Sequence, residues 1–98
     1  MNYFLTPEAE AELAQAAAFY AANVSLNVAR NFLARFEEKV RLLAELPGIG
    51  TPTTKGRRLF PIGRYPYSLL YRVDDGVVRI SAIAAHARRP QYWPERKP

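Results

Sequence analysis

The sequence predicts a small α+β domain in which a helical hairpin packs on one face of a twisted antiparallel sheet, in the order β-α-α-β-β-β. In the first half, apolar residues recur at spacings of three and four, whereas in the second half they alternate. A stretch rich in Gly, Pro and Thr, residues 47–56, separates the halves as a loop. The 98 residues, 49% hydrophobic, suit one domain, so we assign 1–98 to it, with 88–98 as a C-terminal tail.

The first half predicts a short strand followed by two helices. The run NYFL precedes Thr6 and Pro7, which suit the N-cap and first position of a helix that reaches about residue 22. Ser25 suits the N-cap of a second helix, which runs to residue 46 before Pro47 ends it. The helices carry apolar stripes and should form an antiparallel hairpin. These stripes are Ala9, Leu13, Ala16, Ala17 and Tyr20, and then Ala29, Phe32, Phe36, Val40 and Leu43.

The second half predicts three strands, with the sequences RRLFPI, YPYSLLYRV and VVRISAIAA. Asp75 and Gly76 join the last two as a two-residue hairpin. Alternation turns one set of side chains towards the helices: Tyr67, Leu69, Tyr71, Val73, Val78, Ile80, Ala82 and Ala84. It leaves Ser68, Arg72, Arg79 and Ser81 on a face that no remaining segment is long enough to cover. We expect function on that face.

Composition narrows the chemistry. The chain has no Cys, which excludes disulfides, a thiolate nucleophile and thiolate zinc sites, and its single His means that a metal site would need several carboxylates. We expect no metal and no cofactor. The first residues lack a basic region followed by an apolar run, and no stretch approaches the length of a membrane span. The expected protein is therefore soluble, unexported and cytoplasmic, with no membrane partner.

The charge is distributed unevenly. Residues 1–51 hold four basic and six acidic residues, a net charge of −2, whereas residues 52–98 hold ten basic and three acidic ones, a net charge of +7. A basic second half favours an anionic partner, such as a nucleic acid or an acidic protein segment. A basic surface that serves solubility alone is the alternative.

Three segments in order resemble the RelE/ParE superfamily of type II toxin–antitoxin toxins, also called plasmid stabilisation proteins. They are TPEAEAEL, ARNFLARFEEKVRLLAELPGIGTP and GRRLFPIGRYPYSLLYRVDDGVVRISAIAAHARRPQYW, which together span nearly the whole chain. The most specific part is the strand pair followed by His86, Arg88 and Arg89, similar to the H-x-R-R ending of the ParE-like branch. The resemblance implies a toxin that arrests growth. It also implies a cognate antitoxin, expected to be a small acidic DNA-binding protein, in a toxin–antitoxin hetero-oligomer.

The resemblance implies one of two targets. ParE-like members inhibit DNA gyrase and are not nucleases, and we favour this branch, with the C-terminal tail as a contact surface. RelE-like members are metal-free endoribonucleases that cleave mRNA on the ribosome. A third alternative is an inactive toxin-fold relic. Whether the chain is an enzyme therefore depends on the branch.

Metal-free RNA cleavage requires a base, an acid and cations around the phosphate. Under the RelE-like alternative, the catalytic residues are His86, Arg64 and Arg89, because a histidine titrates near neutral pH and arginines bind phosphate. A regular last strand would instead turn His86 towards the helices as a core histidine. Residues expected to bind the target or nucleic acid are Lys55, Arg57, Arg58, Arg72, Arg88, Tyr92 and Trp93.

Two of these residue groups carry a more specific expectation. RelE-like nucleases tend to have lysines near position 55, whereas this chain has one Lys and two Arg there, which supports anion binding more than catalysis. Tyr92 and Trp93 are expected to hold the tail against the sheet, while Arg88 and Arg89 face the target or the antitoxin.

The helices hold more apolar side chains than one buried face needs, and the surplus suggests contacts with an antitoxin. The candidate residues are Leu13, Phe19, Tyr20, Leu33 and Leu42. The alternative is an ordinary core with a few exposed apolar side chains.

Overall fold

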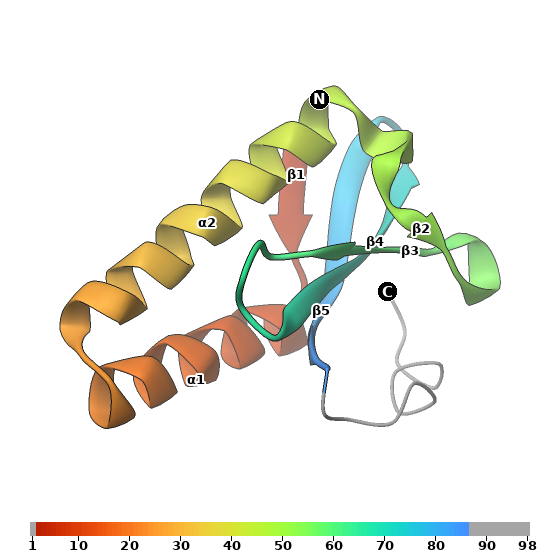
Figure 1. The fold of residues 1–98 in the computed structure, drawn as a ribbon. Coiled ribbons are helices and arrows are strands. Elements are labelled where there is room, and N and C mark those ends of the chain that lie inside the picture. Colours follow the sequence, from red (N-terminus) through yellow and green to blue (C-terminus); the bar gives the residue numbers. More distant parts are fainter. Residues whose placement is uncertain (1, 87–98) are drawn as a thin grey trace.

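The computed structural model describes residues 2–86, in which a pair of helices lies beside a five-stranded sheet (Figure 1). The elements are β1 Asn2–Leu5, α1 Pro7–Asn23, α2 Leu26–Glu45, β2 Thr51–Pro52, β3 Arg58–Pro61, β4 Tyr67–Asp74 and β5 Val77–Ala85. Short 3₁₀ turns, Pro47–Ile49 and Thr54–Gly56, flank β2 in the region predicted as a loop. The predicted element order is confirmed.

Side-chain caps fix where both helices begin. The Ala9 N–H donates to the Thr6 hydroxyl at 3.2 Å, and the Val28 N–H donates to the Ser25 hydroxyl at 3.1 Å. Both predicted N-caps are therefore confirmed, and each helix ends within one residue of the predicted position. The two helices form an open V in Figure 1. Neither has the length and apolar character to cross a membrane, considering the described residues.

The sheet is mixed rather than wholly antiparallel. Its strand order is β1-β5-β4-β3-β2, and β1 pairs with β5 in parallel, whereas the other pairs are antiparallel. The prediction of an antiparallel sheet is wrong for this one pair. Parallel pairing needs a long connection, and the helical hairpin with β2 to β4 supplies it. As a result, β1 is an edge strand.

A β-bulge in β5 divides this strand into two halves of opposite phase. Leu70 pairs with Ala82 but Tyr71 pairs with Ile80, so Ser81 is an extra residue. Val78 and Ile80 face the helices as predicted. Ala82 and Ala84 instead pack with Leu70 in a separate cluster on the other side of the sheet. The predicted facing of these two alanines is wrong because one extra residue reverses the alternation.

The main core lies between the helices and the sheet. All five residues of the predicted α2 stripe are buried, and Ala9 and Ala16 of the α1 stripe are buried as well. Strand residues Leu69, Tyr71 and Ile83 complete this core. The helices are thus fixed on one face, and the other face carries the candidate site.

Candidate functional site

The face of the sheet opposite the helices is called the open face below. The strand registers and contacts place the following residues on it: Phe4, Arg57, Leu59, Ser68, Leu70, Arg72, Asp74, Arg79, Ala82, Ala84 and His86. Leu70, Ala82 and Ala84 are buried, and Leu59 packs against them. Charged and polar groups therefore surround an apolar centre.

Two arginines face each other across β4 and β5 and share one carboxylate. Arg72 is the register partner of Arg79. The Asp74 carboxylate oxygen Oδ2 lies 3.7 Å from Arg72 Nη2 and 3.9 Å from Arg79 Nη2. Like charges directly opposite in a sheet repel, and a single carboxylate offsets only part of this repulsion. The group therefore keeps a net positive charge, with both arginine side chains about one-third exposed.

Arg57 is the third arginine of the open face, and it is almost completely buried, with 1% of its surface exposed. Its Nε donates to the Thr54 carbonyl and its Nη2 donates to the Thr54 hydroxyl, both at 3.1 Å. Burial lowers the pKa of Arg57, and the nearby charge of Arg72 lowers it further. Target binding by Arg57 stays a prediction, and in the structure its buried side chain holds the preceding turn.

Lys55 and Arg58 lie on either side of Arg57. Lys55 is exposed and adopts a left-handed backbone conformation, with φ of 61°, which is uncommon for a residue other than glycine. The Arg58 guanidinium donates to the carbonyls of Gly48 and Gly50 at 3.1 and 2.8 Å. Of the predicted basic cluster, Lys55 thus remains exposed, while Arg58 is used in the loop.

Tyr71 holds the same loop from the helix side of the sheet. Its hydroxyl donates to the Pro47 carbonyl at 2.7 Å and accepts the Gly50 N–H at 3.0 Å. Burial raises the pKa of Tyr71, and the Gly50 hydrogen bond and the charge of Arg58 oppose this rise. This clamp fixes the loop that leads into β2, ahead of Lys55 and Arg57.

The raised pKa predicts alkaline sensitivity. An unfolded tyrosine titrates near about pH 10, so the neutral Tyr71 hydroxyl stabilises the fold fully below that pH and loses this effect as pH rises through the raised value. In urea titrations, we expect the free energy of unfolding to decline above about pH 10, and to decline less steeply in Tyr71→Phe. Part of this pH dependence should remain in Tyr71→Phe, because the pKa of Tyr20 is also raised, first by burial and then by Tyr67 and Tyr65. An unchanged slope in Tyr71→Phe would contradict this assignment, and Tyr3→Phe is the control.

His86 lies on the open face and is exposed. Its Nε2 shares a hydrogen bond of 2.9 Å with the Ser68 hydroxyl, and its backbone N–H donates to the Pro66 carbonyl at 2.9 Å. The alternative of a core histidine is wrong, because the bulge at Ser81 reverses the facing of the residues after it. The imidazole is therefore accessible to a bound molecule.

The structure does not bring together Arg64 and His86, the two predicted catalytic residues that it describes. Arg64 lines a pocket of about 440 Å³ with Asn31 and Arg35 of α2, whereas His86 lies on the face away from the helices. The remaining predicted residues, Arg88, Arg89, Tyr92 and Trp93, lie outside the described residues. Within residues 2–86, no group of three or more His, Asp or Glu side chains is arranged to hold a metal ion.

The predicted antitoxin contacts divide into core and surface residues. Leu13 and Tyr20 pack against the core, and Leu42 is half-buried. Phe19 and Leu33 are exposed, and Val24 and Leu26 add two further exposed apolar residues that were not predicted. These two lie at the turn between the helices, where periodicity gives no signal.

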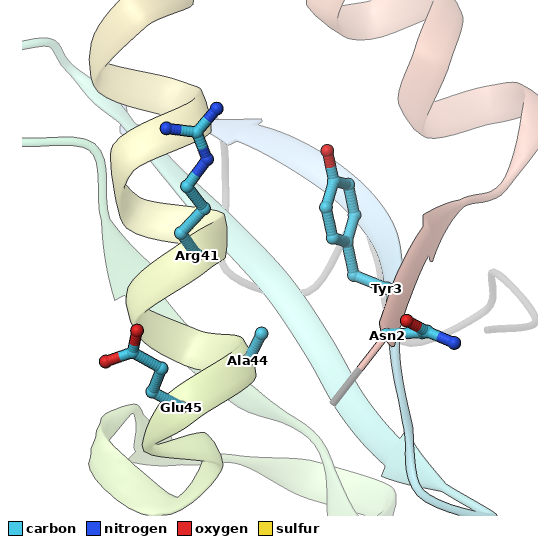
Figure 2. Close-up of a pocket in the computed structure, with 5 residues that line it drawn as sticks. All are labelled: Asn2, Tyr3, Arg41, Ala44 and Glu45. Carbon is cyan, nitrogen blue, oxygen red and sulfur yellow. The ribbon is translucent and has the colours of Figure 1, made fainter.

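A groove of about 450 Å³ between β1 and α2 was also not predicted (Figure 2). Asn2 and Tyr3 of β1 line one side, and Arg41, Ala44 and Glu45 of α2 line the other. It joins segments about forty positions apart, which no local sequence pattern connects.

Comparisons with known proteins agree with the fold. No individually curated protein matches the chain. Among solved structures, the chain is similar to one described as the chromosomal ParDE TA system from P. aeruginosa, with 25% identity and a TM-score of 0.76, covering 87% of this chain and 95% of the other. Residues 3–90 match the family described as the ParE toxin of the type II toxin–antitoxin system, parDE. This match covers both helices, all but the first residue of the sheet and the whole open face, and the chain therefore belongs to the ParE toxin family.

Proposed function

We propose that the chain arrests bacterial growth by inhibiting DNA gyrase through its open face, and that a cognate antitoxin neutralises it. The observation that carries the proposal is the arginine group of Arg72 and Arg79. These two arginines face each other across the sheet, are each about one-third exposed and share the single carboxylate of Asp74. Such a group is unfavourable for folding alone, and an anionic partner would stabilise it.

A binding function agrees better with this face than catalysis does. Among the described residues of the open face, Asp74 supplies the carboxylate that could act as a base, and two arginines already contact it. Arg64, a predicted catalytic partner of His86, instead lines a pocket together with Asn31 and Arg35 of α2. The ParE family assignment supports the same branch, for which the resemblance implies gyrase inhibition.

One observation supports RNA cleavage as a second candidate. His86 is exposed on the open face, and Ser68 orients its ring through a hydrogen bond of 2.9 Å. A histidine held in this way could serve as a general acid or base for cleavage.

The antitoxin would contact surfaces of two kinds. The exposed apolar residues Phe19 and Leu33 offer contacts to an apolar segment. An acidic segment would be attracted to the arginine group of the open face. An antitoxin that covered this group would block access of the target to the same surface.

A supercoiling assay with purified gyrase tests the proposal. We expect the wild-type chain to inhibit supercoiling, and the double variant Arg72→Ala/Arg79→Ala to be weaker by about ten- to a hundredfold, because it removes two partly exposed cations from the contact surface. The matched control is Arg35→Ala/Arg41→Ala, which removes the same charge from exposed positions on α2.

Mapping RNA 5′ ends after induction separates the two candidates. Growth arrest with intact messages and inhibited gyrase supports the proposal. New ends in translated messages that disappear in His86→Ala would support RNA cleavage instead. Equal potency of the two double variants would exclude the arginine group as the contact surface.

A further inference from the structure

Among residues 2–86, β1 pairs only with β5, so its other edge is open to backbone pairing. The Thr6 N–H donates to the Ile80 carbonyl, and Phe4 is the register partner of Arg79, so the backbone groups of Phe4 and Thr6 point towards β5. Backbone directions alternate along a strand, so those of Tyr3 and Leu5 point outwards. The opposite edge of the sheet offers few backbone groups for pairing, because β2 has only two residues and one of them is Pro52. The strand β1 has no proline or charged residue, which are features that commonly protect an edge.

Aromatic side chains flank this edge on both faces. Tyr3 projects on the helix side into the groove that Arg41, Ala44 and Glu45 line from the other side (Figure 2), and it is 42% exposed. Phe4 projects on the open face, where Arg79 lies 4.4 Å from its ring centre, and is 38% exposed. An apolar strand with unpaired backbone groups and exposed aromatic rings is typical of a surface that associates with another strand.

We propose that β1 pairs antiparallel with β1 of a second copy of this chain, around a two-fold axis at Phe4. This axis places Tyr3 of each copy opposite Leu5 of the other copy. Both outward-pointing residues of each strand then exchange backbone hydrogen bonds. The two Phe4 side chains meet at the axis on the open face, and each Tyr3 packs beside a Leu5 on the helix side. The result is one continuous sheet across the dimer.

The charges around β1 favour a second copy over a strongly charged partner. Arg79 lies 3.9 Å from Asp74 on the open face. On the helix side, Arg41 lies 3.6 Å from Glu37 and shares the groove with Glu45. Charges of both signs therefore flank the edge, whereas α1 carries only acidic charges and the arginine group keeps a net positive charge. A highly acidic segment would be attracted to the arginine group rather than to β1.

The absence of cysteine from the chain allows a test of both the dimer and its register. At the proposed axis, the two Phe4 positions form a pair that is not hydrogen-bonded, with Cα atoms about 4.5 Å apart, which a disulfide can bridge. The two Tyr3 positions are diagonal neighbours, about 7–8 Å apart and beyond its reach. We expect oxidised Phe4→Cys to form a covalent dimer, and Tyr3→Cys and the exposed control Phe19→Cys to remain monomeric on non-reducing gels.

Sedimentation of the full chain over about a hundredfold range of concentration is the companion measurement. We expect a concentration-dependent dimer that Phe4→Lys abolishes, because it places like charges opposite each other at the axis, and that Phe19→Lys leaves intact. A wild-type chain that stays monomeric throughout would overturn the proposal, and so would cross-linking of Tyr3→Cys in preference to Phe4→Cys. These readouts do not depend on gyrase inhibition or RNA cleavage.

Discussion

Gly50→Ala is expected to destabilise the fold by about 2–4 kcal/mol, because it combines overpacking with the loss of a buried hydrogen bond. The backbone of Gly50, with φ of −69°, is accessible to any residue, so the constraint is space. A Cβ at this position would lie 2.6 Å from the Tyr71 hydroxyl, 2.8 Å from Tyr71 Cε1 and 3.0 Å from Arg58 Cβ. The loop and Tyr71 would have to separate, and the clamp that Tyr71 forms with Pro47 and Gly50 would open.

Urea denaturation followed by circular dichroism measures this effect, with Gly48→Ala as the control. A Cβ on Gly48, two residues earlier in the same loop, meets no atom within 4 Å. We expect its free energy of unfolding to stay within about 0.5 kcal/mol of the wild type. In a Tyr71→Phe background, the cost of Gly50→Ala should be smaller but still present, since the hydroxyl is gone and Cε1 remains. Equal losses for Gly48→Ala and Gly50→Ala would contradict this explanation.

The elements of the fold were predictable because each depends on local signals. Thr6 and Ser25 cap the helices as predicted, and the five apolar residues of α2 are all buried. The hairpin at Asp75 and Gly76 has positive φ at both positions, as its sequence indicates. Parallel pairing of β1 with β5 was not predictable, because it depends on which edge of the sheet remains free after the hairpin has formed.

The candidate site was predictable in composition but not in geometry. Ser81 is small and polar in a strand that otherwise alternates, and nothing in the sequence marks it as a bulge, yet it determines that His86 lies on the open face. Three basic residues lie close together in the sequence: Lys55, Arg57 and Arg58. The sequence does not indicate that Arg57 is buried and Lys55 exposed. Their roles depend on carbonyls and hydroxyls of the preceding loop.

Phe32→Ala is expected to have the largest effect on stability, about 3–5 kcal/mol, since it removes a fully buried aromatic ring. The Phe32 ring centre lies 5.3 Å from that of Tyr20, 5.2 Å from Tyr65 and 5.5 Å from Tyr67. It therefore joins both helices to the turn between β3 and β4. Pro66 lies in that turn and accepts the backbone N–H of His86, so the loss should also reach the open face.

Small domains are stabilised by only about 5–15 kcal/mol, so Phe32→Ala is best compared with Phe32→Leu, which keeps most of the volume and should retain the fold. Phe19→Ala is the control, because that ring is 55% exposed and contacts Tyr20 from the solvent side. Chemical denaturation gives the stability of each variant, and amide hydrogen exchange at His86 reports on the turn. We expect exchange at His86 to be faster in Phe32→Leu than in Phe19→Ala. If the two variants protected this amide equally, the aromatic cluster would have no part in positioning His86, and the imidazole would depend on Ser68 alone.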